Sequence, residues 1–347
     1  MNRAVVVVLL ALLPVTAGAA ERREEAVREW DARGLARLEV DNPRGDVAVR
    51  ASRDDRVHLV ALKLVRNADG RGAAELARGV RVDADRQGDA LAIAVRYPQR
   101  REIRLDVWDL MKGVRIPEIE VRVSIDVPAG VVVVLHTASG DVQTAGLVAT
   151  QRVTTMSGDV DVTDARGPLT ISTRSGDVML GDVGAVAVGT ASGDVTIDAA
   201  RGLVDVGTQS GDVRIDSASD SVTVETASGE VRVGLARVAL DVETASGDVT
   251  ARAGGRVRVR TATGEAKVAL VAPLRYADVT TASGDVSLRL GPGVEGEIDA
   301  DAGSGDVSVD VGMALKSTHG NHVTGRLGRG TARLVVRSAS GSVDIAR

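Results

Sequence analysis

The sequence contains no cysteine and no phenylalanine, and its 347 residues include only two tryptophans and two tyrosines. Without cysteine, disulfides cannot stabilise the fold, so stability has to come from packing. Without phenylalanine, the core has to be thin and to consist of Val, Ile, Leu, Ala and Thr. Sugar-binding grooves often use aromatic rings as platforms, so the scarcity of aromatics also argues against such a groove.

Long hydrophobic runs and an excess of one charge are also missing from most of the chain. Its 43 basic and 48 acidic residues give a net charge of −5 and are interspersed, which gives no reason to expect a nucleic-acid partner. After the N-terminus, no run approaches the roughly 18 apolar residues of a membrane helix. We therefore expect no transmembrane anchor in the mature chain.

The N-terminus is organised like a secretory signal peptide. Arg3 precedes an apolar run over residues 4–13, and the small residues 17–20 precede the charged Glu21. We expect residues 1–20 to be removed, with cleavage after Ala19 or Ala20. The mature protein is then periplasmic, secreted or on the cell surface, and without a cysteine to carry a lipid we expect that it is not a lipoprotein.

One phrase, Thr-x-Ser-Gly-Asp-Val-x-Val, recurs through the chain and is most regular at residues 190–197. Successive copies are 17 to 21 residues apart, and we interpret the final interval of 36 as two periods with one phrase missing. A short fixed period is typical of stacked repeats, because one unit cannot bury its apolar face alone. The glycines of the phrase are Gly140, Gly158, Gly176, Gly193, Gly211, Gly229, Gly247, Gly264, Gly284, Gly305 and Gly341.

Side-chain alternation predicts two short strands in each repeat. Apolar and polar residues alternate on both sides of Ser210-Gly211-Asp212, which is the two-residue period of a strand with one buried face. Thr208 and Val213 are an odd number of residues apart, so the chain turns between them, and glycine permits that turn. A second break follows at residues 198–202. We predict an all-β fold, a parallel β-solenoid over residues 136–347 with coils about 4.8 Å apart.

Residues 21–135 are predicted to form a β-rich region with one short helix that covers the end of the solenoid. It contains a divergent copy of the phrase at residues 42–47, so we interpret Arg44-Gly45-Asp46 as a repeat turn rather than a cell-receptor motif. The charged segment 22–30 favours a helix as well. We expect a short helix at 72–78 and strands at 57–65, 80–82, 91–97, 119–127 and 131–135.

The basic stretch 98–117 is the least regular part of this region and contains Trp108. We interpret it as a solvated loop. A contact with a partner or an anionic surface is the alternative.

The acidic residue of the phrase forms a predicted ladder, one carboxylate per coil. We favour a structural role, in which backbone N–H groups of the turns bind these carboxylates and solvent screens them. Calcium ions bridging successive coils are the alternative. Calcium-binding rolls use a different phrase, Gly-Gly-x-Gly-x-Asp, so we expect no metal or other cofactor. The ladder candidates are Asp141, Asp159, Asp177, Asp194, Asp212, Glu230, Asp248, Glu265, Asp285 and Asp306.

The threonine of the phrase forms a second ladder, which the alternation directs inward, where we expect hydroxyls to bond along the stack. His319 and His322 are three residues apart, as zinc ligands can be, but no cysteine or carboxylate completes a set at the usual spacing. We interpret them as part of a glycine-rich loop, and His58 and His136 as isolated. The threonines are Thr137, Thr155, Thr173, Thr190, Thr208, Thr226, Thr244, Thr261 and Thr281.

No residue pattern predicts catalysis. The sequence has no Gly-x-Ser-x-Gly nucleophile motif, and its carboxylates belong to the repeat rather than to a distinct pair astride a sugar bond. From Thr137 onward, Tyr276 is the only aromatic residue that could support a sugar. We therefore predict no enzyme and no catalytic residues. A polysaccharide-acting β-helix enzyme is the alternative.

Three features together suggest a known family: residues 38–42 followed by Gly45-Asp46-Val47, the Ser-Gly-Asp-Val series, and the ending at 327–330 and 334–345. In these features the chain resembles a large bacterial family of putative adhesins of unknown function. The resemblance covers about residues 35–347. It implies an exported β-solenoid at the cell envelope and no catalytic residues to carry over.

We predict a non-catalytic exported protein of the cell envelope or surface, which presents a repetitive solenoid surface for adhesion or partner binding. The expected partner is an envelope or extracellular protein or a glycan. A structural scaffold is an alternative, because a last strand at Ser342–Ala346 without a cap would allow end-to-end self-association.

Overall fold

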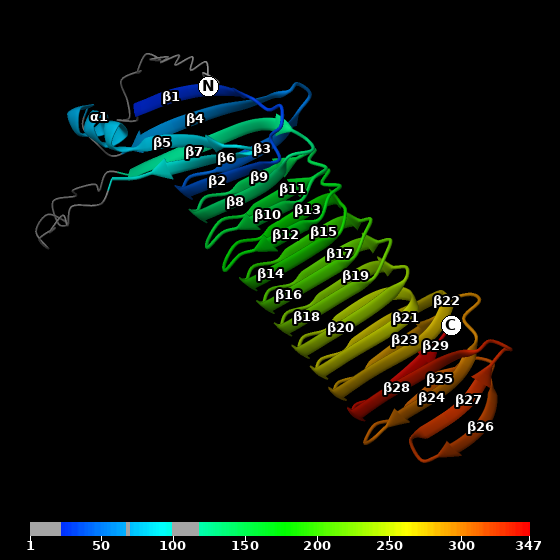
Figure 1. Cartoon of the computed structure of the whole chain (residues 1–347). Helices are drawn as coiled ribbons and strands as arrows, with labels where there is room; N and C mark the ends of the chain where they lie inside the picture. The colour runs from blue at the N-terminus through cyan, green and yellow to red at the C-terminus, as the bar shows by residue number, and fades with distance from the viewer. Residues whose placement is uncertain (1–21, 67–69, 99–117) are drawn as a thin grey trace, which may run out of the picture. The chain divides into compact units, whose positions relative to one another are not determined.

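The computed structural model describes residues 22–66, 70–98 and 118–347, which are almost entirely β-structure (Figure 1). Contacts divide the chain into two compact units, residues 1–161 and 162–347, and each is described by itself. Within each unit, short strands stack mostly in parallel, one coil on the next, which confirms the predicted β-solenoid. The expected signal peptide, residues 1–20, and residues 99–117 of the basic loop lie outside the described residues.

In the first unit, strands pair in two rows. One row is β5–β6–β2–β8–β10 and the other is β1–β4–β7–β3–β9; β1, β4 and β5 pair antiparallel and the others in parallel. The elements are β1 (Arg22–Asp31), β2 (Arg37–Arg44), β3 (Val47–Ser52), β4 (Arg56–Arg66), α1 (Gly70–Gly79), β5 (Arg81–Gln87), β6 (Ala90–Arg96), β7 (Glu118–Pro128), β8 (Val132–Ser139), β9 (Val142–Ala145) and β10 (Gln151–Thr154), with β11 (Val160–Thr163) at the boundary.

In the second unit, one row is β12–β14–β16–β18–β20 and continues through the second halves of β21 and β22 to β28, β24, β27 and β26. The other row is β13–β15–β17–β19 and continues through the first halves of β21 and β22 to β23, β29 and β25.

The first strands of this unit are β12 (Leu169–Ser172), β13 (Val178–Val183), β14 (Val186–Ser192), β15 (Val195–Ala200), β16 (Val204–Ser210), β17 (Val213–Ala218), β18 (Val222–Ser228), β19 (Val231–Ala236) and β20 (Ala239–Ser246). The later ones are β21 (Val249–Thr263), β22 (Ala266–Ser283), β23 (Val286–Leu290), β24 (Gly296–Ala302), β25 (Val307–Asp310), β26 (Ala314–His319), β27 (His322–Leu327), β28 (Ala332–Ser340) and β29 (Val343–Ala346).

The core follows the predicted alternation. In β16, Val204 and Val206 are fully buried while Asp205 between them is exposed, and in β17 Val213 and Ile215 are buried in the same way. Burying one such aliphatic side chain contributes about 1.5–3 kcal/mol, so each coil adds several of these increments. The core is therefore built from aliphatic ladders and needs no phenylalanine.

The end of the chain does not form the last coil in space. β28 lies between β22 and β24, and β29 lies between β23 and β25. The 36-residue interval therefore contains the antiparallel hairpin β26–β27 and a return strand, not an incomplete phrase. Because β29 is paired on both sides, the last strand of the chain is not the uncapped edge on which the end-to-end assembly alternative was based.

The start of the chain is arranged in the same way. β2 lies between β6 and β8, and β3 lies between β7 and β9. The expected short helix is confirmed as α1, next to β4 and β1. Lys63 of β4 holds the end of this helix, since its ammonium donates to the carbonyl oxygens of Ala77 (3.0 Å) and Val80 (2.6 Å).

Residues 22–31 form strand β1 rather than the expected helix. They pair antiparallel with β4 along its whole length, from Arg22 opposite Val65 to Asp31 opposite Arg56. Local sequence favours a helix here, but the open edge of β4 supplies a complete set of backbone partners. Within the described residues, no helix has the length and apolarity that a membrane span requires.

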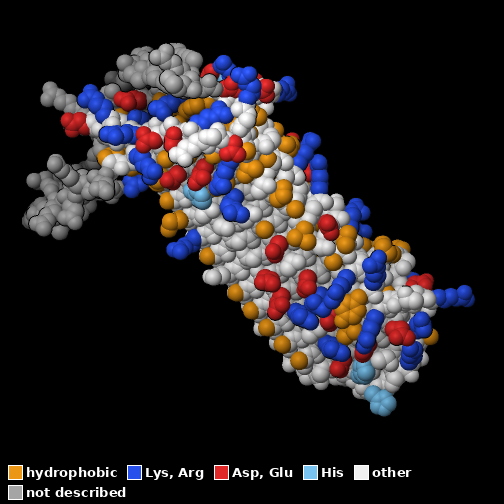
Figure 2. Space-filling model, viewed as in Figure 1, with side chains coloured by type: hydrophobic (Ala, Val, Ile, Leu, Met, Phe, Trp, Pro, Cys, Tyr) orange, Lys and Arg blue, Asp and Glu red, His pale blue; other side chains and the backbone are white. Residues whose placement is uncertain are grey.

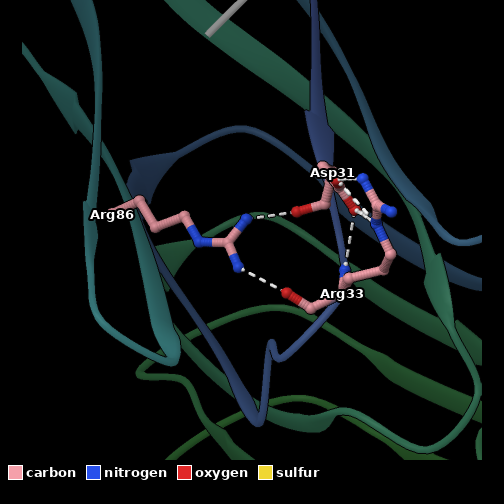
Figure 3. Close-up of polar contacts among 3 residues, drawn as sticks. All are labelled: Asp31, Arg33 and Arg86. Atoms are coloured by element: carbon pink, nitrogen blue, oxygen red, sulfur yellow. Dashed lines mark hydrogen bonds and ion pairs between the residues drawn. The ribbon is translucent and has the colours of Figure 1, made fainter. Parts of the chain in front are cut away.

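Arg86 of β5 fixes the turn that follows β1 (Figure 3). Its guanidinium donates to the carbonyl oxygens of Asp31 and Arg33 (2.9 Å to the latter). The side chain of Arg33 in turn hydrogen-bonds the Asp31 carboxylate and, with its own backbone N–H, lowers the pKa of Asp31 to about 2. These contacts join β1 and β5, the outer strands of the two rows.

The glycine of each phrase is fixed by its turn and by its neighbour. Gly211 has a φ of +143°, where L side chains are rarely found, and a Cβ added to it would lie 2.2 Å from the carbonyl oxygen of Gly193. Gly341 in the same way abuts Gly284, and Gly305 abuts Gly341, which repeats the spatial order of the coils. The turn therefore stacks only if every copy is glycine.

We expect Gly211→Ala to lower the free energy of unfolding by about 3 kcal/mol, because it combines a strained φ with a backbone clash. Gly207→Ala is the matched control four residues earlier, since nothing lies within 4 Å of its added Cβ. In a strand interior this change stabilises by about 0.5–1 kcal/mol. Urea unfolding of both variants measures the difference, and equal effects would contradict the proposed role of the turn.

Candidate functional site on the outer face of the repeats

The acidic ladder is built into the backbone of the fold. Within each unit, the Oδ1 atom of a ladder aspartate accepts the backbone N–H of the ladder residue on the neighbouring coil. Asp194 accepts from Asp212 at 2.8 Å, and Asp212 accepts from Glu230 at 2.8 Å. The further bonds run from Asp159 to Asp141 (3.0 Å), Asp194 to Asp177 (2.9 Å), Glu265 to Asp248 (2.8 Å) and Ser342 to Asp285 (2.7 Å).

The two glutamates of the ladder are engaged differently. Glu265 pairs with Lys267 at 2.7 Å, a hydrogen bond that raises the pKa of the lysine, and Glu230 pairs with Arg232. Within the described residues, no three Asp, Glu or His side chains are grouped so that they could hold a metal ion. Hydrogen bonds along the stack and local ion pairs hold these ladder carboxylates.

The threonine ladder is buried, with 1–9% of each side chain exposed. Most of its hydrogen bonds do not run along the stack as expected. The hydroxyls of Thr155, Thr173, Thr226 and Thr261 donate to the carbonyl oxygen two residues later in the same coil, at 3.0–3.3 Å. Only Thr281 reaches the neighbouring coil, at Gly264, among the threonine bonds that the described residues show.

The histidines are not brought together as a metal site. His319 and His322 face each other across the β26–β27 hairpin, and His322 contacts Asp299 at 2.8 Å. His58, isolated in the sequence, lies beside Asp54 (2.8 Å), whose hydrogen bond raises the pKa of the imidazole against the effect of burial.

Arg44-Gly45-Asp46 is a repeat turn, as expected. Gly45 has a φ of +99° and abuts the backbone of Val121, and Asp46 accepts the backbone N–H of Asp141 at 3.2 Å. The guanidinium of Arg44 lies over the ring of Tyr97, 5.7 Å from its centroid. All three residues thus make contacts within the first unit.

An open groove of about 1060 Å³ crosses the second unit at the ends of β14, β16, β18, β20, β21, β22 and β28. With strands about 4.8 Å apart, seven strands give it a length of about 29 Å. Its walls are the residues on either side of the buried threonines, and most of those that follow a threonine are alanines. The apolar row along this edge is visible in Figure 2. The row comprises Ala227, Ala245, Ala262, Ala282 and Ala339.

Polar residues, three of them charged, lie on the other side of the threonines. Glu225, Glu243, Arg260 and Thr280 occupy equivalent positions on successive strands of the groove. Sequence reasoning missed them because it followed the invariant positions of the phrase. The signal was present in the residue that precedes each threonine, which varies from coil to coil more than the phrase does.

The family model described as Toastrack DUF4097 matches residues 35–256, more than half of the chain. The protein belongs to the toastrack DUF4097 family. The resemblance drawn from the phrase and the N-terminal strand is thereby confirmed. Among curated proteins, no relative matches this toastrack chain.

Solved structures similar to this toastrack protein are distant from it. A putative adhesin from Bacteroides fragilis is 9% identical over 92% of this chain and 96% of its own, with a TM-score of 0.28. A putative lipid binding protein from Parabacteroides distasonis is 12% identical over 93% and 97%, with a TM-score of 0.32. A putative adhesin from the same species is 8% identical over 92% and 96%, with a TM-score of 0.33. The assignment rests on the family match.

We expect Asp212→Ala to destabilise the toastrack fold by about 1 kcal/mol, because the backbone N–H of Glu230 loses its acceptor. Asp205→Ala, at an exposed aspartate in the same coil, is the control and should stay within about 0.5 kcal/mol of the parent. Thermal and urea unfolding measure both variants.

The calcium hypothesis gives a different outcome for the same pair. If calcium bridged the coils, millimolar Ca²⁺ would raise the melting temperature of the parent and of Asp205→Ala, and less that of Asp212→Ala. We expect no shift in any of the three proteins. A calcium-dependent shift lost only in Asp212→Ala would restore the metal role.

Proposed function

We propose that the protein is a non-catalytic binding protein of the cell envelope or cell surface, and that the groove of the second unit is its binding face. The observation that carries this proposal is the groove itself, open, about 1060 Å³ in volume and formed by seven strands. Its length of about 29 Å suits an extended partner that lies across several repeats.

The chemistry of the groove suits binding. Small side chains such as Ala227 and Ala245 let a partner approach the strands closely, and the charged side chains beside them supply polar contacts. A rigid stacked sheet fixes these positions before the partner arrives, which lowers the entropy lost on binding.

Two groove carboxylates, Glu225 and Glu243, are the observation that favours an enzyme instead. They do not belong to the ladder, and they lie directly opposite each other on β18 and β20. Glycoside hydrolysis, however, needs one carboxyl group on each side of the scissile bond. In-register neighbours of a parallel sheet project from the same face, so both would approach a bound sugar from one side.

Export is part of the proposal. The signal-peptide pattern of residues 1–20 supports export. The proposal also includes a division of the mature chain into a β-rich capping region over 21–135 and a repeat region over 136–347. A non-catalytic binding face is most useful where its partner is displayed, at the envelope or outside the cell.

The test is binding to a glycan array and to isolated cell-wall polymers, with Ala245→Trp as the variant. A tryptophan in the groove should weaken binding of the best array ligand at least tenfold, because it occupies space that the partner fills. Thr250→Trp, at an exposed position of the first half of β21 in the other row, should bind like the parent.

The same ligand should be recovered intact after prolonged incubation with the protein. Release of new reducing ends that Glu225→Gln abolishes would establish the enzyme. Absence of any bound ligand, or equal binding by Ala245→Trp, would contradict the groove as the binding face.

A further inference from the structure

Five arginines of the second unit flank Tyr276, Asp278 and Thr280 of β22. The outward residues of β21, β22 and β28 lie in register as three rows, Arg256–Tyr276–Arg333, Arg258–Asp278–Val335 and Arg260–Thr280–Arg337. Strand spacing places the two columns of arginines about 10 Å apart, and the rows about 6.7 Å apart. We call this set the arginine patch; its members are Arg256, Arg258, Arg260, Tyr276, Arg333 and Arg337.

The four corner arginines of the patch are available to a partner. Arg258 pairs with Asp241 at 3.3 Å, whereas Arg256, Arg260, Arg333 and Arg337 are exposed and make no ion pair with any residue that the structure describes. The carboxylate opposite Arg333, Glu297, is already held by Lys316 at 2.7 Å and Arg326 at 3.7 Å. Within the three rows, Asp278 is the one carboxylate beside the five guanidinium groups, and further carboxylates lie on the bordering strands β20 and β24.

Tyr276, in the row between Arg256 and Arg333, is held in place by its neighbours. Its hydroxyl lies 3.3 Å from Asp278, which also accepts the hydroxyl of Thr280 at 3.1 Å, and the guanidinium of Arg256 lies 6.0 Å from the ring centroid. The half-buried ring is thus fixed between two arginine columns. An amphipathic ring in such a place can stack on a sugar while arginines bind its acidic groups.

From these observations we propose that the arginine patch binds one linear acidic polysaccharide chain, whose carboxylates pair with the corner arginines while one sugar ring rests on Tyr276. The inference rests on the proposed binding function and names its partner class. The patch shares Arg260 with the groove, and Thr280 next to Arg260 also lines the groove, so the same chain can continue into it.

The charge pattern around the patch selects a narrow polyanion over a membrane. Acidic residues border both sides: Asp241 and Glu243 on β20, and Glu297, Asp299 and Asp301 on β24. Figure 2 shows the Lys and Arg side chains gathered in this part of the second unit with acidic side chains nearby. An extended anionic lipid surface would cover the acidic residues of β20 and β24 as well as the patch, and at a Debye length of about 8 Å these residues would repel it. A single polyanion chain would lie over the patch alone.

Nucleic acid fits the patch less well. Sites for single strands stack successive bases on a series of aromatic rings. Tyr276 is the only aromatic residue of the second unit. One platform flanked by bidentate arginines suits a sugar chain with one acidic group per residue or per repeat.

The experiment measures binding of the full protein to polygalacturonate, a linear polymer with one carboxylate per sugar. We expect binding that weakens as salt rises, and a loss of about 20-fold or more for the double variant Arg256→Ser/Arg333→Ser, which removes two charge-assisted contacts. The matched control is Arg214→Ser/Arg232→Ser on β17 and β19, which removes the same charge from the other row and should lose less than about threefold. Thermal melting confirms that both doubles are folded, and Arg260→Gln/Arg337→Gln repeats the test at the other two corners.

Three outcomes would overturn the proposal: no binding by the parent, equal losses in the patch and control doubles, or undiminished binding by both patch doubles. Neutral dextran, vesicles of phosphatidylcholine with phosphatidylglycerol, and an oligothymidylate serve as competitors. If vesicles or the oligonucleotide bind the patch as tightly as polygalacturonate does, the acidic-polysaccharide assignment is wrong. If Ala245→Trp blocks an array ligand that both patch doubles still bind, this inference fails while the proposed function stands.

Discussion

The close approach of one glycine turn to the next is the constraint on which the rest of this structure depends. At Gly211 there is no room for a Cβ against the carbonyl oxygen of Gly193, so successive coils can stack only with glycine at this corner. That contact sets the register, and the register places Asp194 where its carboxylate accepts the backbone N–H of Asp212. The same register stacks Val195 on Val213 in the core. Turn, ladder and core are therefore consequences of one backbone contact.

The glycine contact requires only that two coils be neighbours in space, and these coils need not be consecutive in the sequence. Gly341 rests on Gly284, fifty-seven residues earlier, with the same geometry that Gly211 has on Gly193. Strands β28 and β29 can thus return into the stack, leaving β24, β25 and the β26–β27 hairpin beyond them. In the first unit, β4 pairs antiparallel with β7, and the charged strand β1 pairs antiparallel with β4. Parallel stacking therefore ends at β7, where it would otherwise continue to an open edge.

Much of this fold could be predicted from the sequence because the repeat states its own geometry. The alternation around Ser210-Gly211-Asp212 is enough to predict two strands, a glycine turn and an outward aspartate, and all three are present. The local sequence pattern fails where pairing with a distant strand determines the structure. Residues 22–31 look helical until the edge of β4 is known, and the position of β29 between β23 and β25 has no local signature at all.

The candidate site was hidden from sequence reasoning for a related physical reason. Invariant residues of a repeat are those that the stack requires, so Thr208, Gly211 and Asp212 report on structure and not on a partner. Positions that the stack leaves free, the outward residues of each strand, can differ from coil to coil, and only these can make one part of the surface chemically distinct. Arg256 and Arg333 are seventy-seven residues apart in the sequence and become neighbours on either side of Tyr276 only through the register of β21, β22 and β28. In a protein of this architecture, functional residues are found by comparing the outward residues of neighbouring strands, because along the chain the structural repeat dominates the sequence pattern.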